Sequence, residues 1–245
     1  MKKFLKPFCF LLTVCLLAGA VAVPASAAKK KKKNKRAGIT IGIDPGHQQR
    51  GNYSKEPIGP GSRIRKARVA GGTSGRYSGI PEYKLTLSVA KKLQSELKRR
   101  GYKVVMTRTK NNVNISNAQR AKLLNKKCRV AVRLHADGAG PSARGASAQC
   151  STKRNRYIGR LASKCQKLSS CVLNSYCKKT GRKNRGISYR DDLTGTNYSK
   201  IPVTLIEMGF MTNKSDDSYM ASSKNQTKMA KGIADGIDRY FGFKK

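Results

Sequence analysis

Apolar residues recur along this chain with two different periods. Three isoleucines alternate with small residues over positions 39–43, before a turn at residues 44–46, and this alternation predicts a first strand. Leucines and a valine then repeat every fourth position between Pro81, which suits a helix start, and Gly101, which suits a helix end. The pattern therefore predicts a strand followed, after a long interval, by an amphipathic helix.

The rest of the chain continues this alternation of strands and helices. Only residues 48–80 lack a period, and we interpret them as a long irregular segment that is either functional or mobile. Such an alternation predicts a single three-layer α/β domain with a twisted, mostly parallel or mixed sheet and helices on both faces. We expect further strands at residues 104–107, 130–134, 145–150 and 203–206, and further helices at residues 116–125, 158–172 and 229–241.

The first residues have the composition of a targeting sequence. Lysines at positions 2, 3 and 6 precede an apolar run over 8–23, and small residues follow at 25–27. This pattern predicts a secretory signal peptide over residues 1–27, with an uncleaved membrane anchor as the alternative. Residues 29–36 are basic except for Asn34, and such a block of like charge predicts a disordered linker over residues 28–37. Residues 38–245 then form one catalytic domain, in which we expect order to begin at Ile39.

The charge balance is strongly basic. Lys and Arg number 53 against 12 acidic residues, a net charge of +41, and such a surface attracts polyanions. The sequence contains no zinc finger or RNA-binding aromatic motif, so we expect no nucleic acid partner. Since the protein is predicted to be exported, anionic polymers of a bacterial wall are the expected counterpart, although any single lysine is more simply explained as a solvated side chain.

Five cysteines remain after the predicted signal peptide. Three of them recur every six residues in a helical stretch, about 240° apart, so they cannot bridge one another without breaking the helix. Any disulfide would need Cys128 or Cys150, and a reduced buried thiol is an equal alternative for each. The five are Cys128, Cys150, Cys165, Cys171 and Cys177.

The chain has two histidines, and each follows a predicted strand. His47 comes after the first strand and its turn, and His135 comes directly after the strand at residues 130–134. An isolated histidine is usually a core or capping residue. Because the carboxyl ends of parallel strands meet at one edge of a sheet, however, these two can converge on an ion such as Zn²⁺.

A catalytic zinc needs a third protein ligand and an open position for water. Glu82 directly follows Pro81 at the start of the first long helix, where its alternative role is to complement the positive end of the helix dipole. Glu56, in the irregular segment, is the rival ligand. We take Glu82 as the candidate.

Glu207 stands out among the few carboxylates of this chain. It lies between the apolar residues 203–206 and a Met-Gly-Phe segment at 208–210. Burial raises the proton affinity of a carboxylate and prepares it to take a proton from a water molecule and pass it on. The alternative is an ion pair with one of the many arginines.

Taken in order, the segments around His47, Glu82, His135 and Glu207 resemble those of a known family, the zinc-dependent N-acetylmuramoyl-L-alanine amidases. The resemblance extends over residues 39–243, and Thr107, Arg108, Arg120 and Asn125 look like further family positions. Where the family often has Asn, this chain has Asp137, a change expected to alter substrate contacts. The segments are IDPGH at 43–47, PE at 81–82, VRLHAD at 132–137 and LIEMGF at 205–210.

The resemblance implies His47, Glu82 and His135 as ligands of Zn²⁺, and Glu207 as the catalytic glutamate. Its implied reaction is hydrolysis of the amide bond between N-acetylmuramic acid and L-alanine in peptidoglycan, with zinc activating the water and Glu207 moving its proton. We expect a secreted or wall-associated bacterial enzyme with no stable membrane span after signal cleavage. The alternatives are a non-enzymatic, basic wall-binding protein and a zinc peptidase that shortens stem peptides.

Overall fold

The computed structural model describes Met1 and residues 34–243. The predicted signal peptide, apart from Met1, and most of the predicted linker lie outside these residues. Within the described part, residues 34–37 form a turn in which Asn34 donates to the carbonyl of Arg100, and Arg36 pairs with Asp238 at 2.7 Å. These side chains bind the folded domain ahead of Ile39, the residue at which the sequence analysis expects order to begin.

Strands and helices alternate as the sequence predicts. The main sheet contains six strands and the domain also carries a separate hairpin. The strands of the main sheet are β1 (Thr40–Pro45), β4 (Lys103–Met106), β5 (Val130–Asp137), β6 (Ala146–Cys150), β7 (Asn184–Tyr189) and β8 (Val203–Phe210), and the hairpin is β2 (Asn52–Pro57) and β3 (Arg65–Val69). The helices are α1 (Glu82–Arg99), α2 (Asn117–Asn125), the 3-10 turn η1 (Gly159–Leu161), α3 (Ala162–Thr180), α4 (Thr194–Asn197), α5 (Lys214–Ala221) and α6 (Ser223–Tyr240).

The main sheet is mixed, with strand order β4-β1-β5-β8-β6-β7. Strands β4, β1, β5 and β8 run parallel, β6 pairs antiparallel with β8, and β7 pairs parallel with β6. In the parallel part, β1, β5 and β8 are neighbours, so their carboxyl ends lie side by side. This is the edge at which sites in α/β sheets gather.

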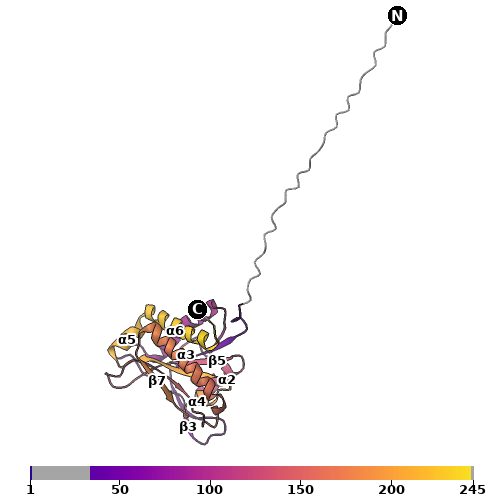
Figure 1. Ribbon diagram of the computed structural model, residues 1–245. Coiled ribbons are helices and arrows are strands. Elements are labelled where there is room, and N and C mark those ends of the chain that lie inside the picture. Colours follow the sequence, from indigo (N-terminus) through magenta and orange to yellow (C-terminus); the bar gives the residue numbers. More distant parts are fainter. Residues whose placement is uncertain (2–33, 244–245) are drawn as a thin grey trace. The chain divides into compact units, whose positions relative to one another are not determined.

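Helices cover both faces of the sheet, as predicted. Helix α6 packs against both α1 and α3, and these three helices cover one face, where α3 and α6 run side by side in Figure 1. Their core contains the inward residues Ile41, Ile43, Val132 and Ile206, all with no exposed surface. Fully burying one such side chain contributes about 1.5–3 kcal/mol, so this face supplies much of the stability.

The opposite face of the sheet carries α2 and the residues of the candidate site. Because side chains alternate across a strand, the strand residues between the core positions project to this second face. Leu124 of α2 packs there against Gly42 and Ala131, the small residues that let the helix approach the sheet. Helix α2 is capped by Ser116, whose hydroxyl accepts from the Gln119 amide.

Several predicted features differ from the structure. The segment 48–80 is not irregular throughout, because β2 and β3 form an antiparallel hairpin within it. Strand β7 and helix α5 were not predicted, and the strands at 130–134 and 203–206 extend further, to Asp137 and Phe210. These extensions place two site residues inside strands rather than after them.

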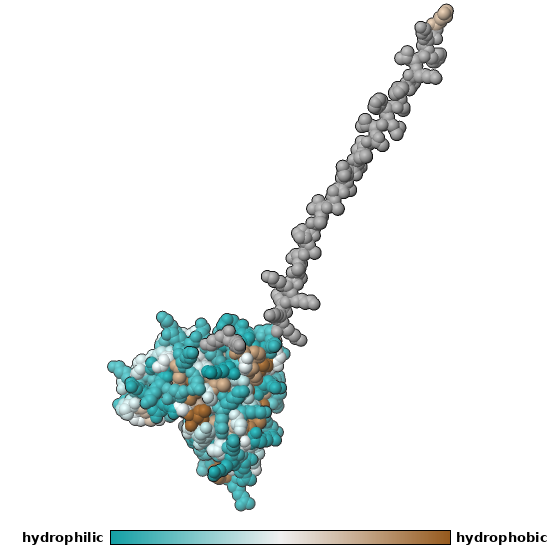
Figure 2. Space-filling model, in the orientation of Figure 1, coloured by the Kyte–Doolittle hydropathy of each residue, from teal (hydrophilic) through white to brown (hydrophobic). Residues whose placement is uncertain are grey.

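The five cysteines of the described chain form no disulfide, and four of them are buried. Among the residues that the structure describes, none of the helices is long and apolar enough to cross a bilayer. On the face seen in Figure 2, hydrophilic side chains dominate and apolar ones form small separate patches. The charge of the chain is thus displayed at the surface around an apolar interior.

Candidate metal centre

His47 lies in the turn after β1, in a left-handed backbone conformation with φ of 58°. Two buried arginines hold this turn by its carbonyl groups. Arg120 donates to the carbonyls of Pro45 and His47 at 2.8 and 2.9 Å, and Arg108 donates to those of Pro45 and Gly46 at 3.0 and 2.9 Å. Donors in a fixed planar arrangement on two sides of the turn stabilise a backbone geometry that is costly for a non-glycine residue.

A buried carboxylate anchors this arrangement. Asp44 is 1% exposed and accepts from Arg120 at 3.0 Å, from the Nε of Arg133 at 2.9 Å and from the hydroxyl of Thr107. Burial alone would raise the pKa of Asp44, but the two guanidinium groups outweigh it and lower that pKa far below its usual range. The three charges therefore form one network directly beneath the His47 turn.

His135 and Glu207 project from neighbouring strands at the same height. They are register partners on β5 and β8, and their side chains point to the same face of the sheet. The sequence prediction placed each after the end of a strand, whereas both lie within one. The parallel pairing of β5 and β8 brings the two side chains to the same edge of the sheet.

Glu82 reaches this edge from the start of α1. Its side chain is buried, with the residue 3% exposed. Oε1 accepts from the amide of Ala136 at 3.0 Å, and Oε2 accepts from the amide of Thr73 at 3.1 Å. The two backbone donors fix the orientation of the carboxylate, so its position serves more than the helix dipole.

Three potential ligand atoms converge at this point. The Nε2 of His47, the Nδ1 of His135 and the Oε1 of Glu82 are separated from one another by 3.1 Å, pair by pair. Donors bonded to a tetrahedral zinc ion at 2.0–2.1 Å would lie about 3.3 Å apart. Two imidazole nitrogens and one carboxylate oxygen at this spacing fit a Zn²⁺ site with one open position.

Two glycines make room for this cluster. A Cβ at Gly46 would lie 2.4–2.7 Å from the ring of His135, and a Cβ at Gly72 would lie 2.9 Å from both His47 and the Glu82 carboxylate. Any side chain at these positions would displace a ligand. The close approach explains why glycine stands at both positions.

The two histidines differ in protonation: burial lowers the pKa of His47, but its hydrogen bond with Glu82 outweighs burial and raises that pKa above its usual value. Burial lowers the pKa of His135 to about 4, so its ring is neutral at pH 7 and has a free lone pair. The Nδ1 of His47 lies 2.8 Å from the carbonyl of Ala70, which fixes the proton on that nitrogen and leaves Nε2 to face the cluster. A backbone partner of this kind is typical of metal-binding histidines.

Glu207 lies beside the cluster in a nearly dry environment. It is 8% exposed, Oε1 accepts from the side chain of Gln149 at 3.4 Å, and Oε2 has no hydrogen-bond partner among the described residues. Burial, with smaller contributions from the charges of Glu82 and Asp137, raises the pKa of Glu207 well above its usual value. No ion pair with an arginine is found for it in the described chain, so that alternative is not supported.

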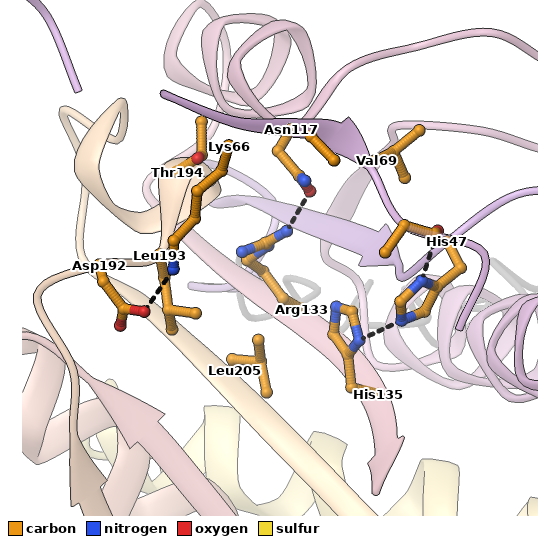
Figure 3. Close-up of a pocket in the computed structure, with 13 residues that line it drawn as sticks. His47, Lys66, Val69, Asn117, Arg133, His135, Asp192, Leu193, Thr194 and Leu205 are labelled. Atoms are coloured by element: carbon orange, nitrogen blue, oxygen red, sulfur yellow. Dashed lines mark hydrogen bonds and ion pairs between the residues drawn. The ribbon is translucent and has the colours of Figure 1, made fainter. Parts of the chain in front are cut away.

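The cluster opens into two cavities. One, of about 530 Å³, is lined by Glu82, Asp137 and Glu207 together with both histidines. The other, of about 360 Å³, lies over Leu205 and the side chain of Arg133. Figure 3 shows the two histidines at one end of this second cavity and the Lys66–Asp192 ion pair at the other.

Several expected residues have other places. Glu56, the rival ligand, lies on β2, where it accepts from the amide of Ala118 at the start of α2 at 3.1 Å, away from the cluster. Asn125 joins the end of α2 to residues 198–200 through two hydrogen bonds. The roles of Thr73 and Gln149 were missed, because neither a threonine in a polar loop nor a glutamine in a short strand carries a signal for a site.

Comparison with known proteins identifies the fold and the family. The sequence profile described as N-acetylmuramoyl-L-alanine amidase matches residues 41–239. An N-acetylmuramoyl-L-alanine amidase of Mycobacterium tuberculosis is 28% identical, with 89% of this chain and 92% of that protein aligned. An uncharacterised protein of Bacillus subtilis is 26% identical over 94% of this chain and 96% of its own length.

Solved structures agree with the sequence matches. The N-acetylmuramyl-L-alanine amidase of Mycobacterium smegmatis superposes with a TM-score of 0.77 at 25% identity, over 84% of this chain and 98% of that one. The corresponding amidase of Mycobacterium abscessus gives a TM-score of 0.76 at 26% identity, over 84% of this chain and all of that one. The chain described here belongs to the N-acetylmuramoyl-L-alanine amidase family.

Proposed function

We propose that this amidase is a secreted, zinc-dependent enzyme in which His47, Glu82 and His135 hold the ion and Glu207 moves the proton. Its substrate bond is the amide between the lactyl group of N-acetylmuramic acid and the first L-alanine of the stem peptide. The observation that carries the proposal is the convergence of three ligand atoms at mutual distances of 3.1 Å beside a buried carboxylate.

The zinc would supply polarisation of the attacking water and of the scissile carbonyl. Backbone groups orient two of the three ligands: the carbonyl of Ala70 holds the ring of His47, and the amides of Thr73 and Ala136 hold the carboxylate of Glu82. Zinc is favoured over harder cations because two of the three donors are imidazole nitrogens.

Glu207 has the properties of a general base and then a general acid. Its raised proton affinity allows it to take a proton from the attacking water as the water oxygen bonds to the lactyl carbonyl carbon. It then donates that proton to the alanine nitrogen as the carbon–nitrogen bond breaks. The products are a lactyl carboxylic acid and a stem peptide with a free amino terminus.

The surface charge supports action at a bacterial wall. A net charge of +41 favours binding to anionic wall polymers, and the predicted signal peptide would bring the protein there. Screening by salt should weaken this binding. Sedimentation with isolated walls at increasing salt concentration measures it, and binding that does not change with salt would remove electrostatic attraction from the proposal.

Product analysis tests the reaction. Purified peptidoglycan is digested with the protein and the soluble products are identified by mass spectrometry. An amidase releases intact stem peptides that begin with alanine, a peptidase shortens the stems, and a binding protein releases nothing. Shortened stems or no release would contradict the proposal.

Variants separate the metal ligands from the base. Glu207→Gln should retain bound zinc and lose at least about 100-fold in turnover, the usual contribution of a general acid–base. His135→Ala should lose the zinc itself. Glu56→Gln is the matched control, because its buried carboxylate lies on β2 and should affect neither metal content nor products.

A further inference from the structure

A third cavity, separate from the two at the metal cluster, is lined by arginines. It has a volume of about 540 Å³ and lies between the turn of the β2–β3 hairpin and residues 154–157. Arg63 comes from the hairpin turn, and Arg154 and Arg156 come from the facing loop. We call these three residues the arginine pocket. None of the three forms an ion pair with a carboxylate within the described chain, although Arg156 lies 5.6 Å from the ring centre of Tyr157.

The loop that carries two of these arginines is fixed by buried hydrogen bonds. Asn155, between them, is 6% exposed, and its side-chain oxygen accepts from the amides of Tyr157 and Ile158 at 2.9 and 3.2 Å. Its side-chain nitrogen donates to Asp191 at 3.0 Å and to Asn197 at 2.9 Å. The backbone positions of Arg154 and Arg156 are therefore set before any ligand binds.

One carboxylate, Asp191, lines the pocket together with the arginines and is already used by the loop. Asp191 accepts from the amide and the hydroxyl of Thr152 at 2.9 and 2.6 Å, in addition to the Asn155 bond. Its hydrogen bonds go to neutral groups, so its charge is not paired with an arginine. The guanidinium groups thus face the cavity with their donors available.

The hairpin is packed firmly against the same loop. A Cβ at Gly59 would lie 2.7 Å from the ring of Tyr157, so the glycine lets the turn approach that ring closely. Ile58 is buried and its amide donates to the carbonyl of Ile64 at 3.0 Å, which closes the turn around Arg63. Arg63 therefore lines the cavity from the hairpin, whereas Arg154 and Arg156 line it from the facing loop.

Three guanidinium groups around one cavity, exposed and without a carboxylate partner in the described chain, favour an anionic ligand. Arginine donates from a planar fork that matches phosphate or carboxylate oxygens, and it accepts nothing. One isolated carboxylate is satisfied by a single arginine, whereas three arginines from two separate segments match successive charges along a chain. The pocket shares no residue with the cavities at the metal cluster, so a ligand bound here leaves the substrate bond accessible.

We propose that Arg63, Arg154 and Arg156 form a docking site for a phosphodiester polymer of the bacterial wall. The inference rests on the proposed wall location and assigns the attraction to one place on the surface. Asp191 of this pocket is followed directly by Asp192, which lines the cavity next to the metal cluster. A docked polymer would therefore hold the enzyme on the wall beside the region where it hydrolyses peptidoglycan.

Wall sedimentation with an inactive protein tests the proposal. The Glu207→Gln protein is mixed with Gram-positive walls before and after hydrofluoric acid extraction, which removes phosphodiester polymers and leaves peptidoglycan. In that background, one triple variant carries Arg63→Gln, Arg154→Gln and Arg156→Gln. The control carries Lys224→Gln, Lys228→Gln and Lys231→Gln, which removes the same three charges from exposed positions of α6.

The arginine variant should bind untreated walls at least about tenfold more weakly than the control, and acid extraction should reduce binding of the control to the same low level. The slope of the logarithm of the binding constant against the logarithm of salt concentration should be smaller by about two to three for the arginine variant than for the control. Each lost phosphate contact reduces that slope by nearly one, because it releases nearly one counterion.

Equal binding of the two triple variants would overturn the proposal. So would control binding that survives acid extraction, because carboxylates of the stem peptides would then be the ligand. The measurement uses a protein without turnover, so its result is independent of the product analysis that tests the amidase reaction.

Discussion

Replacing Asp44 with Asn should destabilise the protein far more than its size suggests. The substitution keeps the shape of the side chain and removes one charge. Arg120 and Arg133, which are 1% and 5% exposed, would then have no carboxylate partner among the described residues. The guanidinium groups would remain buried and positive beneath the His47 turn.

The magnitude follows from this burial. Removing one partner of a buried ion pair costs about 3–5 kcal/mol, because an uncompensated charge is left in a low-dielectric environment. Asparagine still accepts one hydrogen bond, so the lower end of that range applies, about 3 kcal/mol. This is a large part of the 5–15 kcal/mol by which a typical domain is stable.

Urea unfolding followed by circular dichroism at pH 7, with a chelator present in all samples, measures the difference. Asp192→Asn is the matched control, because Asp192 also pairs with two cations, Lys66 and Arg190, but its side chain is 42% exposed. Exposed pairs contribute about 0–1 kcal/mol. A loss at Asp44→Asn no larger than that of Asp192→Asn would refute the argument from burial.

The effect should also depend on pH in one direction. The pKa of Asp44 is lowered on folding, so its contribution is fully present above the unfolded value of about 3.9 and is lost as pH falls toward the folded pKa. The difference in unfolding free energy between the parent and Asp44→Asn should therefore be constant from pH 7 to 5 and shrink below pH 4. A difference that grows on acidification would contradict this sign.

Three further predictions concern the metal cluster. Gly46→Ala should weaken zinc binding at least about tenfold, because the added methyl group would displace the ring of His135. Gly38→Ala, whose added methyl group has no atom nearby, should leave the affinity unchanged. Equal zinc affinities of the two variants in a competition titration would count against the close packing. Glu207→Gln should stabilise the metal-free protein at pH 8, because burial raises the pKa of Glu207 and each pKa unit corresponds to about 1.4 kcal/mol. This gain should vanish below pH 4, where the carboxylate of the unfolded chain is also protonated. Urea titrations at both pH values measure the difference. Zinc at 100 times its dissociation constant should raise the unfolding free energy by about 2.7 kcal/mol in the parent and leave His135→Ala unchanged, and an equal rise in both would place the ion elsewhere.

The site residues that the sequence could predict are those that lie at or near the ends of strands. Two histidines and Glu207 each follow an apolar run, and parallel pairing brings such positions to one edge. Glu82 was predicted because a proline marks the start of its helix. The structure adds the register that aligns His135 with Glu207, which depends on how β5 and β8 pair and is not encoded in either strand alone.

The hairpin and the outer strand could not be predicted from periodicity. Strand β2 and strand β7 are mostly exposed on both sides, so they lack the alternation of apolar and polar residues that reveals a half-buried strand. They are held by contacts with distant segments, such as the hydrogen bond that Glu56 accepts from the Ala118 amide at the start of α2. Tertiary packing, rather than local sequence, determines them.

Buried arginines are equally difficult to recognise. Only the family resemblance singled out Arg120; by composition it is one more surface cation on a helix that also carries Lys122. It is nearly inaccessible to solvent because Asp44 and three backbone carbonyls surround it. Burial of a charge depends on a partner far away in the sequence. In a chain with so many cations, composition cannot single out the few that are internal.

Anomalous X-ray diffraction at the zinc absorption edge, from crystals grown with stoichiometric zinc, tests the central claim most directly. We predict one strong peak about 2.0–2.2 Å from the Nε2 of His47, the Nδ1 of His135 and the Oε1 of Glu82. A peak bound by other residues, or the absence of any peak between the two histidines, would contradict it.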